Sequence, residues 1–155
     1  MTFEYSRTVT TSATAHDVWA LWSDPGSWHC WDPSVESVAL EGHFAEGAAG
    51  MMVLTGGIEV PVTLELVEPG ARYLDRLEMG GLRIHIDHVV KDADGGAEVT
   101  VSTMITGPGA EDIGPMSSAP GPVTMVLTVT SAPPSASLTT WSMWIRSSPI
   151  SSRSR

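Results

Sequence analysis

Alternating apolar and polar residues dominate the middle of the chain and predict a series of antiparallel strands. The clearest alternation covers residues 58–67, where apolar side chains occupy the even positions from Ile58 to Leu66 and polar residues occupy most odd ones. This period of two places one row of side chains against a core and the other row in solvent. Turn signals such as Gly56-Gly57 and Glu68-Pro69-Gly70 separate the runs. The strands expected from this pattern are 35–40, 50–55, 58–67, 71–79, 82–90 and 97–106.

Residues 1–31 follow a different pattern, with one strand and two short helices. Residues 3–11 are rich in aromatic and β-branched side chains and are expected to form a strand. Thr14 and Asp17 form a capping-box signature ahead of an apolar run at helical spacing. Asp24-Pro25-Gly26 ends this helix, and residues 27–31 are expected to form a second helical turn. Because helices do not alternate with strands, the order predicts an α+β domain with an antiparallel sheet.

The composition is that of a folded protein and excludes several classes of partner. Hydrophobic residues make up 42% of the chain and charged residues 17%. The net charge of −10 argues against binding to nucleic acid or to anionic membranes, which needs clustered Lys and Arg. No apolar run approaches the roughly 18 residues of a membrane span, and the first residues lack the pattern of a secretory signal. Cys30 is the single cysteine, which is typical of a reducing compartment, so we expect a cytoplasmic protein. No feature of the sequence sets the oligomeric state.

Residues 116–155 differ sharply in composition from the rest of the chain. All 18 acidic residues lie between Glu4 and Asp112, whereas residues 116–155 contain none. This segment is rich in serine, threonine and proline, and its charges are three arginines. We therefore expect a domain over residues 1–115 and an atypical tail over residues 116–155. The tail is expected to be either the product of a shifted reading frame or a natural variant that forms a short hairpin or stays disordered.

Several motifs before this boundary resemble one family. The run from Ser12 to Val38 is similar to the opening of the Bet v 1/START-like superfamily, also called SRPBCC. The closest branch is the polyketide cyclase/dehydrase-type and lipid-transport branch. The residues that carry the resemblance are Asp17-Val18-Trp19, Leu21, Asp24-Pro25, Trp28, Trp31-Asp32-Pro33, Val35-Glu36 and Val38. Residues 40–47, Glu68-Pro69-Gly70 and Gly107-Pro108 also fit, so the resemblance covers residues 3–115.

The resemblance implies a helix-grip fold. In this fold a curved antiparallel sheet, here of the seven strands expected above, grips a long C-terminal helix around a ligand cavity. The two short N-terminal helices belong to the same architecture. The sequence departs from the family where the closing helix should stand, because Pro115, Pro120 and Pro122 occur there and no apolar stripe of helical spacing follows. We therefore expect the usual long C-terminal helix to be absent or replaced.

Three candidate catalytic residues come from two adjacent strands. His88 shares an apolar strand face with Ile84 and Ile86, so we expect it to point toward the cavity, where an imidazole can donate, accept or move a proton. A core histidine bonded to a neighbour is the alternative. Tyr73 and Asp75 share one face of the preceding strand. An inward Asp75 is costly unless it is paired, so we expect either a pairing with His88 or a bulge that leaves Asp75 in water.

The expected ligand-binding residues are aromatic and apolar side chains of the second helical turn and of several strands. Each of them would serve equally well as ordinary core. They are Trp28, Trp31, Met51, Val53, Val62, Leu64, Ile84, Ile86 and Met104. We predict no metal site, because His29-Cys30 has no second ligand pair at suitable spacing. No cofactor is expected, since a Gly-rich phosphate loop and a nucleophile elbow are both missing from the sequence.

Three functions remain open. The favoured one is the binding of a small hydrophobic molecule, such as a lipid, an isoprenoid or an aromatic polyketide-like compound, in an internal cavity. The resemblance also implies a polyketide cyclase/dehydratase-like enzyme, in which His88 with Tyr73 or Asp75 steers proton transfers. The third is an inactive or interaction-only protein with a defective C-terminus. No motif in the sequence demands catalysis.

Overall fold

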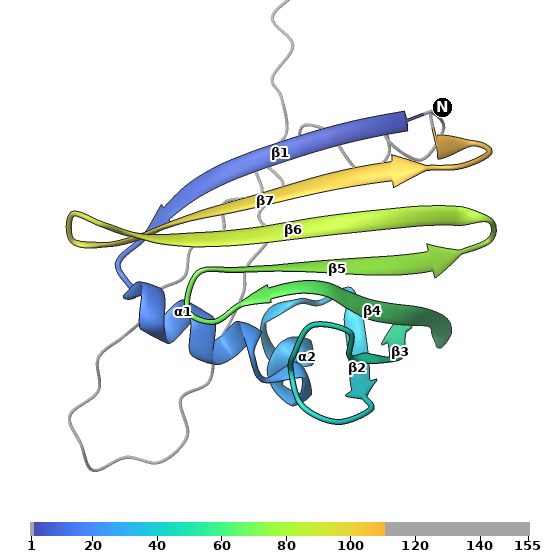
Figure 1. Ribbon diagram of the computed structural model, residues 1–155, viewed down its shortest axis with the longest axis horizontal. Coiled ribbons are helices and arrows are strands. Elements are labelled where there is room, and N and C mark those ends of the chain that lie inside the picture. Colours follow the sequence, from blue (N-terminus) through green and yellow to red (C-terminus); the bar gives the residue numbers. More distant parts are fainter. Residues whose placement is uncertain (1, 111–155) are drawn as a thin grey trace, which may run out of the picture.

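The alternating segments form seven strands of one antiparallel sheet, and two short helices lie beside it (Figure 1). The structure is a computed structural model and describes residues 2–110. The elements in chain order are β1 (Thr2–Thr11), α1 (Ala15–Trp22), a 3₁₀ turn (Pro25–Ser27), α2 (Trp28–Trp31), β2 (Val35–Leu40), β3 (Ala49–Leu54), β4 (Ile58–Glu68), β5 (Arg72–Met79), β6 (Leu82–Ala93) and β7 (Gly96–Thr106).

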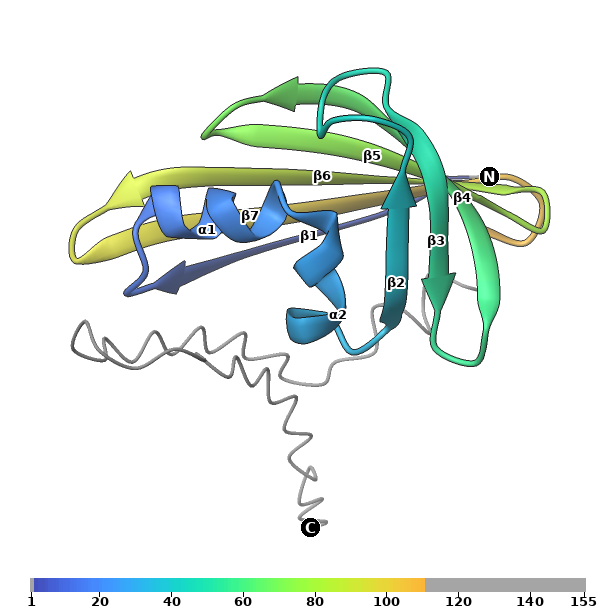
Figure 2. The ribbon, with the colours of Figure 1, turned by 90° about the horizontal axis from the view of Figure 1, so that it is seen from below.

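Strands β2 to β7 form a meander, and β1 pairs with β7 at one edge of the sheet. The strand order is β1-β7-β6-β5-β4-β3-β2, because the chain passes from β1 through the helices to the opposite edge and then returns strand by strand. Figure 2 shows a strong bend, so that β2 and β3 run across the direction of β6 and β7. The helices α1 and α2 lie on the inner side of this bend. We call that side the concave face and the opposite side the outer face.

The predicted capping box starts α1. The Asp17 amide donates to the Thr14 hydroxyl at 3.1 Å, and the Thr14 amide donates to Asp17 Oδ2 at 3.2 Å. Two backbone amides that the helix leaves unpaired are thereby satisfied. The hydrogen bond from the Thr14 side chain also lowers the pKa of Asp17. Val18 and Trp22, one turn apart, are buried on the side that meets the sheet.

A bulge in strand β4 changes which residues of the strand point toward the core. Leu64 lies opposite Asp75 of β5, but Leu66 lies opposite Leu74, so the register shifts between them. Such a bulge places two consecutive residues against one residue of the partner strand. Leu66 consequently faces outward, and the uninterrupted alternation expected over residues 58–67 ends at Leu64. At the other end of the strand, Ile58 is 50% exposed.

The main core lies between the concave face and the helices. A smaller cluster, formed by Leu82, Ile105 and Ala110, lies at the other end of β6 and β7. Full burial of one large aliphatic side chain stabilises the fold by about 2 kcal/mol. The buried members of the main core are Ala13, Ala15, Val18, Trp22, Trp28, Val35, Met52, Val60, Val62, Leu64, Tyr73, Leu77, Val90, Ala97 and Val99.

A glycine permits a close approach at the bend of the sheet. A Cβ atom added to Gly50 of β3 would collide with the carbonyl oxygen of Ala39 in β2. Only a residue without a side chain lets the two backbones come this close. The tail predicted over residues 116–155, and the predicted loss of the long C-terminal helix, lie outside the described residues.

Candidate functional site

The concave face of the central strands is a regular grid, because β5 and β6 pair without a register shift. Tyr73 of β5 lies opposite His88 of β6, and Asp75 lies opposite Ile86. On its other side, Asp75 lies opposite Leu64 of β4. Tyr73 and Asp75 therefore share one face of β5, as the alternation predicted. Asp75 lies between Leu64 and Ile86 on this apolar face.

Asp75 and His88 approach one another inside the protein. Asp75 is only 2% exposed, so the alternative of a solvent-exposed carboxylate does not hold. Its Oδ1 atom lies 3.5 Å from Nδ1 of His88. This separation is too long for a strong hydrogen bond, and neither atom has a hydrogen-bond partner within residues 2–110. The two facing atoms are therefore neighbours whose hydrogen-bonding capacity is unused.

Aromatic rings fix the orientation of His88. The Tyr73 ring stacks on the imidazole, with ring centroids 4.1 Å apart and an interplanar angle of 6°. Trp22 of α1 meets both rings edge-on, with centroid distances of 5.5 Å to each. The His88 side chain still retains 13% of its accessible surface. It is therefore held in one orientation and remains partly reachable.

Burial favours the neutral forms of all three candidate catalytic groups. Burial raises the pKa of Asp75 from 3.8 to about 7 and lowers the pKa of His88 from 6.5 to about 3. Burial also raises the pKa of Tyr73 well above 10, with smaller contributions from the charges of Asp75 and Asp32. At neutral pH the site holds a carboxyl group near its titration midpoint beside a neutral imidazole. Such a pair can donate, accept and exchange a proton.

The two tryptophans of α2 begin a wall of aromatic rings that covers Tyr73 beside this pair. Trp28 stacks on Tyr73 with a centroid distance of 6.0 Å, and its Nε1 donates to the Trp22 carbonyl oxygen at 2.9 Å. Because Trp28 is only 3% exposed, it belongs to the core. Trp31 is half-buried, and its Nε1 is buried without a hydrogen-bond partner in the described part of the chain.

Phe44 completes the aromatic wall, although the sequence analysis did not select it. It lies in the β2–β3 connection, and its ring centroid is 5.3 Å from that of Tyr73 and 6.0 Å from that of Trp19. The available signal was a large apolar residue within an otherwise polar and glycine-containing turn.

The predicted ligand-binding residues are divided between the two faces of the sheet. Val62 and Leu64 are on the concave side but are completely enclosed in the core. Ile84 and Ile86 are half-buried on the concave face, in line with His88. They are the predicted strand residues best placed to touch a bound molecule.

Met51, Val53 and Met104 lie on the outer face of the sheet, which corrects their predicted place beside the ligand. In β3 the inward residue is Met52, which is buried and lies opposite Val60, whereas Met51 is 39% exposed. Strand β3 contains no polar residue, so its alternation could not show which methionine faces the core. Met104 lines a hollow on the outer face.

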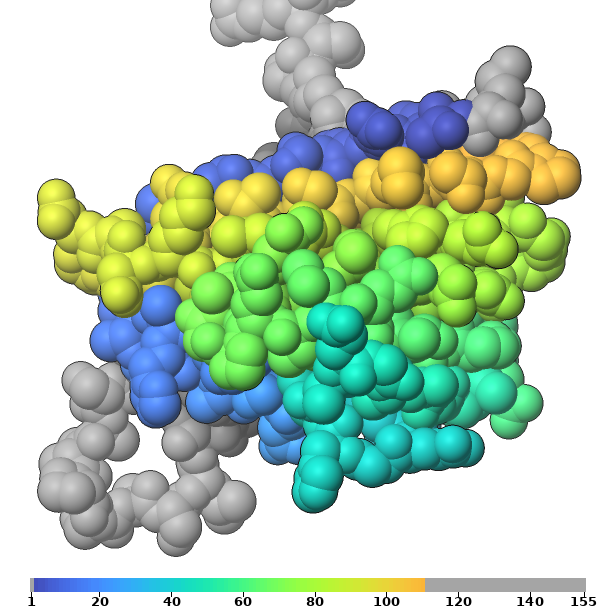
Figure 3. All heavy atoms as spheres, in the orientation of Figure 1, coloured from blue at the N-terminus to red at the C-terminus, as the bar shows by residue number. Residues whose placement is uncertain are grey.

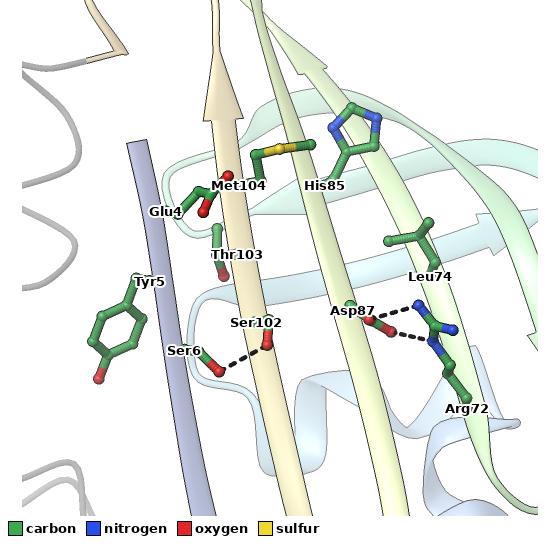
Figure 4. Close-up of a pocket in the computed structure, with 10 residues that line it drawn as sticks. All are labelled: Glu4, Tyr5, Ser6, Arg72, Leu74, His85, Asp87, Ser102, Thr103 and Met104. Atoms are coloured by element: carbon green, nitrogen blue, oxygen red, sulfur yellow. Dashed lines mark hydrogen bonds and ion pairs between the residues drawn. The ribbon is translucent and has the colours of Figure 1, made fainter. Parts of the chain in front are cut away.

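This hollow has a volume of about 540 Å³ (Figure 4). Four of the polar residues around it are bonded to one another in two pairs. Arg72 donates to both carboxylate oxygens of Asp87 at 2.8 Å, and the hydroxyls of Ser6 and Ser102 are 2.8 Å apart. Figure 3 shows this face as a continuous layer of strand side chains. The hollow is lined by Glu4, Tyr5, Ser6, Arg72, Leu74, His85, Asp87, Ser102, Thr103 and Met104.

A metal cluster and a membrane-spanning helix are both absent from residues 2–110. No group of three or more His, Cys, Asp or Glu side chains is gathered there in a way that could hold a metal ion. None of the helices in that range is both long enough and apolar enough to pass through a bilayer.

Comparison with known proteins places the chain in a family. Residues 2–126 match the family model described as "Polyketide cyclase / dehydrase and lipid transport". The chain belongs to this family. The match includes Tyr73, Asp75 and His88, and it extends past the compositional boundary near residue 115. Membership of the Bet v 1/START-like superfamily, predicted from the motifs, is confirmed. No curated protein sequence matches the chain.

Solved structures share the fold of this polyketide cyclase/dehydrase-family protein at low sequence identity. Ara h 8.0201 is 15% identical with a TM-score of 0.60, over 76% of this chain and 91% of that chain. Norcoclaurine synthase from Thalictrum flavum, in complex with dopamine and hydroxybenzaldehyde, is 18% identical with a TM-score of 0.58, over 73% and 75%. The di-domain ARO/CYC protein BexL from the BE-7585A biosynthetic pathway is 18% identical with a TM-score of 0.58, over 73% of this chain and 40% of that chain. These similarities confirm the predicted helix-grip fold, with its curved antiparallel sheet and two short helices. At such low sequence identities they establish the fold alone.

Proposed function

We propose that this family member binds a small, largely apolar molecule on its concave face, such as a lipid, an isoprenoid or an aromatic polyketide-like compound. The observation that carries the proposal is the approach of Asp75 Oδ1 to His88 Nδ1, at 3.5 Å, without hydrogen-bond partners in the described residues. A buried polar atom left without a partner costs about 1–3 kcal/mol. Native proteins keep few such atoms, and those that remain call for an explanation. A polar group on a bound molecule would supply the missing partner.

The surroundings of the pair suit an apolar body. Ile84 and Ile86 continue the strand face of His88 and are only half-buried, so they offer apolar surface beside the polar pair. Pockets for small molecules typically combine apolar walls with a few convergent polar groups. Membership of a family described by cyclase, dehydrase and lipid-transport functions supports the same reading. One structural neighbour, norcoclaurine synthase, is solved with two small aromatic molecules.

A thermal-shift screen tests the binding proposal. Fatty acids, isoprenoids and aromatic polyketides are added to the full-length protein, and a ligand at one hundred times its Kd should stabilise it by about 2.7 kcal/mol. Ile86→Glu should abolish the shift, because it places a charge on the concave face. Val89→Glu is the matched control on the outer face of the same strand. If no compound raises the melting temperature, the proposal is wrong.

Catalysis is the second candidate function, and the pKa of Asp75 favours it. A carboxyl group that titrates at about 7 is suited to proton transfer near neutral pH. His88 would then steer proton transfers during a cyclisation or dehydration, assisted by Asp75 or Tyr73. Each compound that stabilises the protein is incubated with it and analysed by mass spectrometry for products. His88→Ala should retain binding and lose product formation; turnover that survives the substitution rules this mechanism out.

We also propose the cytoplasm as the location, since the single Cys30 has no second cysteine for a disulfide within the chain. The net charge of −10 supports a partner other than nucleic acid.

A further inference from the structure

A second polar position lies across the concave face from Asp75 and His88. Arg7 of β1 lies opposite Val101 of β7, and Val101 lies opposite His88 of β6. With Tyr73 of β5, these residues form one row across four neighbouring strands. Neighbouring strands are about 4.8 Å apart, so Arg7 lies about 10 Å from His88 along the row.

Arg7 differs from every other arginine in the described residues. Arg72, Arg76 and Arg83 each have a carboxylate oxygen within 4 Å, at distances of 2.8, 3.4 and 3.9 Å. Arg7 is half-buried and forms no ion pair with any residue in the range 2–110.

The concave face offers Arg7 no counter-charge nearby. The residues that share its face on β1 and β7 include no acid within the described part of the chain. A partly desolvated cation without a counter-ion is costly. A guanidinium group is also the side chain best shaped for bidentate binding of a carboxylate. Arg7 is therefore suited to a negatively charged group that comes from outside the described sheet.

The surface between the two polar positions is apolar and accessible. Trp22 covers His88 from the side of α1. Val101 of β7, between His88 and Arg7, is only half-buried, as is Ile86 beside His88 on β6. A molecule that reaches Asp75 and His88 therefore approaches from the β1 side and lies across the strands. One end of it then meets Arg7.

We propose that the ligand of the concave face is an amphipathic acid, with an apolar body about 10 Å long, a neutral hydroxyl or keto group at Asp75 and His88, and a carboxylate at Arg7. This inference rests on the binding function proposed above. A hydroxyl group donates to His88 Nδ1, in the tautomer that carries its proton on Nε2, and accepts from protonated Asp75. A carboxylate at that end would meet a second acid in a buried site, so the orientation is fixed by charge.

A matched set of naphthalenes tests the inference on the full-length protein. The set is a hydroxynaphthoic acid with its two groups at opposite ends, its methyl ester, the naphthoic acid without the hydroxyl, and the naphthol without the acid. Binding is measured by calorimetry at mildly acidic pH, where the probe acid is ionised and Asp75 is protonated. The hydroxy acid should bind at least about tenfold more tightly than each of the other three, because the ester and the naphthol lose the charge-assisted bonds to Arg7 and the naphthoic acid leaves the buried atoms of Asp75 and His88 without a partner.

Three variants separate the two ends of the site. Arg7→Gln should remove the preference for the acid over its ester and leave the affinity for the naphthol unchanged. His88→Phe keeps a ring to stack on Tyr73 and should remove the preference for the hydroxyl. Arg83→Gln is the control on the outer face and should change no affinity. Circular dichroism confirms that each variant is folded, and the wild-type comparison among the four probes does not depend on any variant.

The outcomes distinguish this inference from the function on which it rests. Equal affinity for the acid and the ester in the wild type overturns the assignment of Arg7. So does an acid preference that persists in Arg7→Gln. In both cases a neutral probe that still binds leaves the proposed binding function intact. If none of the four probes binds, this ligand class is wrong, and the thermal-shift screen with purely apolar compounds decides whether the binding function survives.

Discussion

The Arg72–Asp87 pair and the Asp75–His88 pair lie on opposite faces of β5 and β6 and use their polar atoms in opposite ways, although their residues alternate along the same strands. On the outer face, Arg72 donates to Asp87 through two hydrogen bonds of 2.8 Å, in contact with solvent. On the concave face, Asp75 Oδ1 and His88 Nδ1 approach to 3.5 Å, and neither of these two atoms has a hydrogen-bond partner in the described residues. Asp87 and His88 are consecutive residues.

An ion pair in contact with solvent and a polar pair buried in an apolar face differ in their effect on stability. Exposed ion pairs contribute little to stability, because water already solvates both partners. A buried polar pair in an apolar face lowers stability unless its hydrogen bonds are made. The Arg72–Asp87 pair is therefore replaceable, whereas the concave pair imposes a cost that ligand binding or proton transfer would explain. Each substitution below tests one side of this contrast.

The largest effect is expected for Asp75→Asn, measured by urea unfolding at a series of pH values. In the wild type the two pKa shifts oppose each other between about pH 4 and 6.5, so the folded and unfolded pairs bind equal numbers of protons and stability is flat. In the variant only the lowered pKa of His88 remains. Its contribution is complete above pH 6.5 and is lost as the pH falls toward about 3, by up to about 5 kcal/mol. Asp87→Asn, on the outer face, is the control; a variant at position 75 with flat stability would contradict the burial of His88 as a neutral group.

His88→Gln should show the reverse dependence. The raised pKa of Asp75 then acts alone, so its contribution is complete below pH 3.8 and is lost as the pH rises to about 7. The expected loss is about 4 kcal/mol, because one pKa unit corresponds to about 1.4 kcal/mol. The same unfolding series measures it. Stability that rises over this range would show that Asp75 is ionised when folded.

Leu64→Ala and Leu66→Ala compare the two faces of β4 on either side of its bulge. Leu64 has no exposed surface and should cost about 3 kcal/mol when truncated, because the core cannot fully close the cavity. Leu66 is half-buried on the outer face and should cost about 1 kcal/mol. Chemical denaturation measures both. Equal losses would mean that the register does not shift between the two positions.

The smallest effect is expected for Arg72→Gln. The ion pair with Asp87 is on the outer face, and the Arg72 side chain is 38% exposed. Its loss should lower stability by less than about 1 kcal/mol, and by less still at high salt. Thermal unfolding at low and high ionic strength checks both points. A salt-independent loss of several kcal/mol would place this pair in the same class as Asp75 and His88.

Short sequence motifs correctly predicted the helix cap, the turns and the strands, because these elements depend on residues close together in the sequence. The capping box of Thr14 and Asp17, the turns at paired glycines and the predicted strands appear where they were expected, although the alternation within β4 ends at Leu64. The inward direction of His88 followed from the same alternation, since consecutive side chains of a strand point to opposite faces, whereas the direction of Asp75 stayed open between the cavity and water. The distance between their side chains could not follow from it, because that distance depends on how two strands are aligned.

Positions without a local signal were decided by packing. Met52 rather than Met51 faces the core because the register of β3 is set by Val60 of β4, and neither methionine is polar enough to mark the solvent side. Phe44 joins the aromatic wall because the β2–β3 connection folds over Tyr73 and Trp28.

The sequence by itself determined the antiparallel order of strands, the capped first helix, the family and the inward face of His88, because periodicity and capping act within one segment. Only the tertiary structure decided that Asp75 and His88 meet without bonding, that Arg7 stands in their row, and that β4 bulges after Leu64. These features arise from the register between strands distant in sequence, and register is a property of the whole sheet.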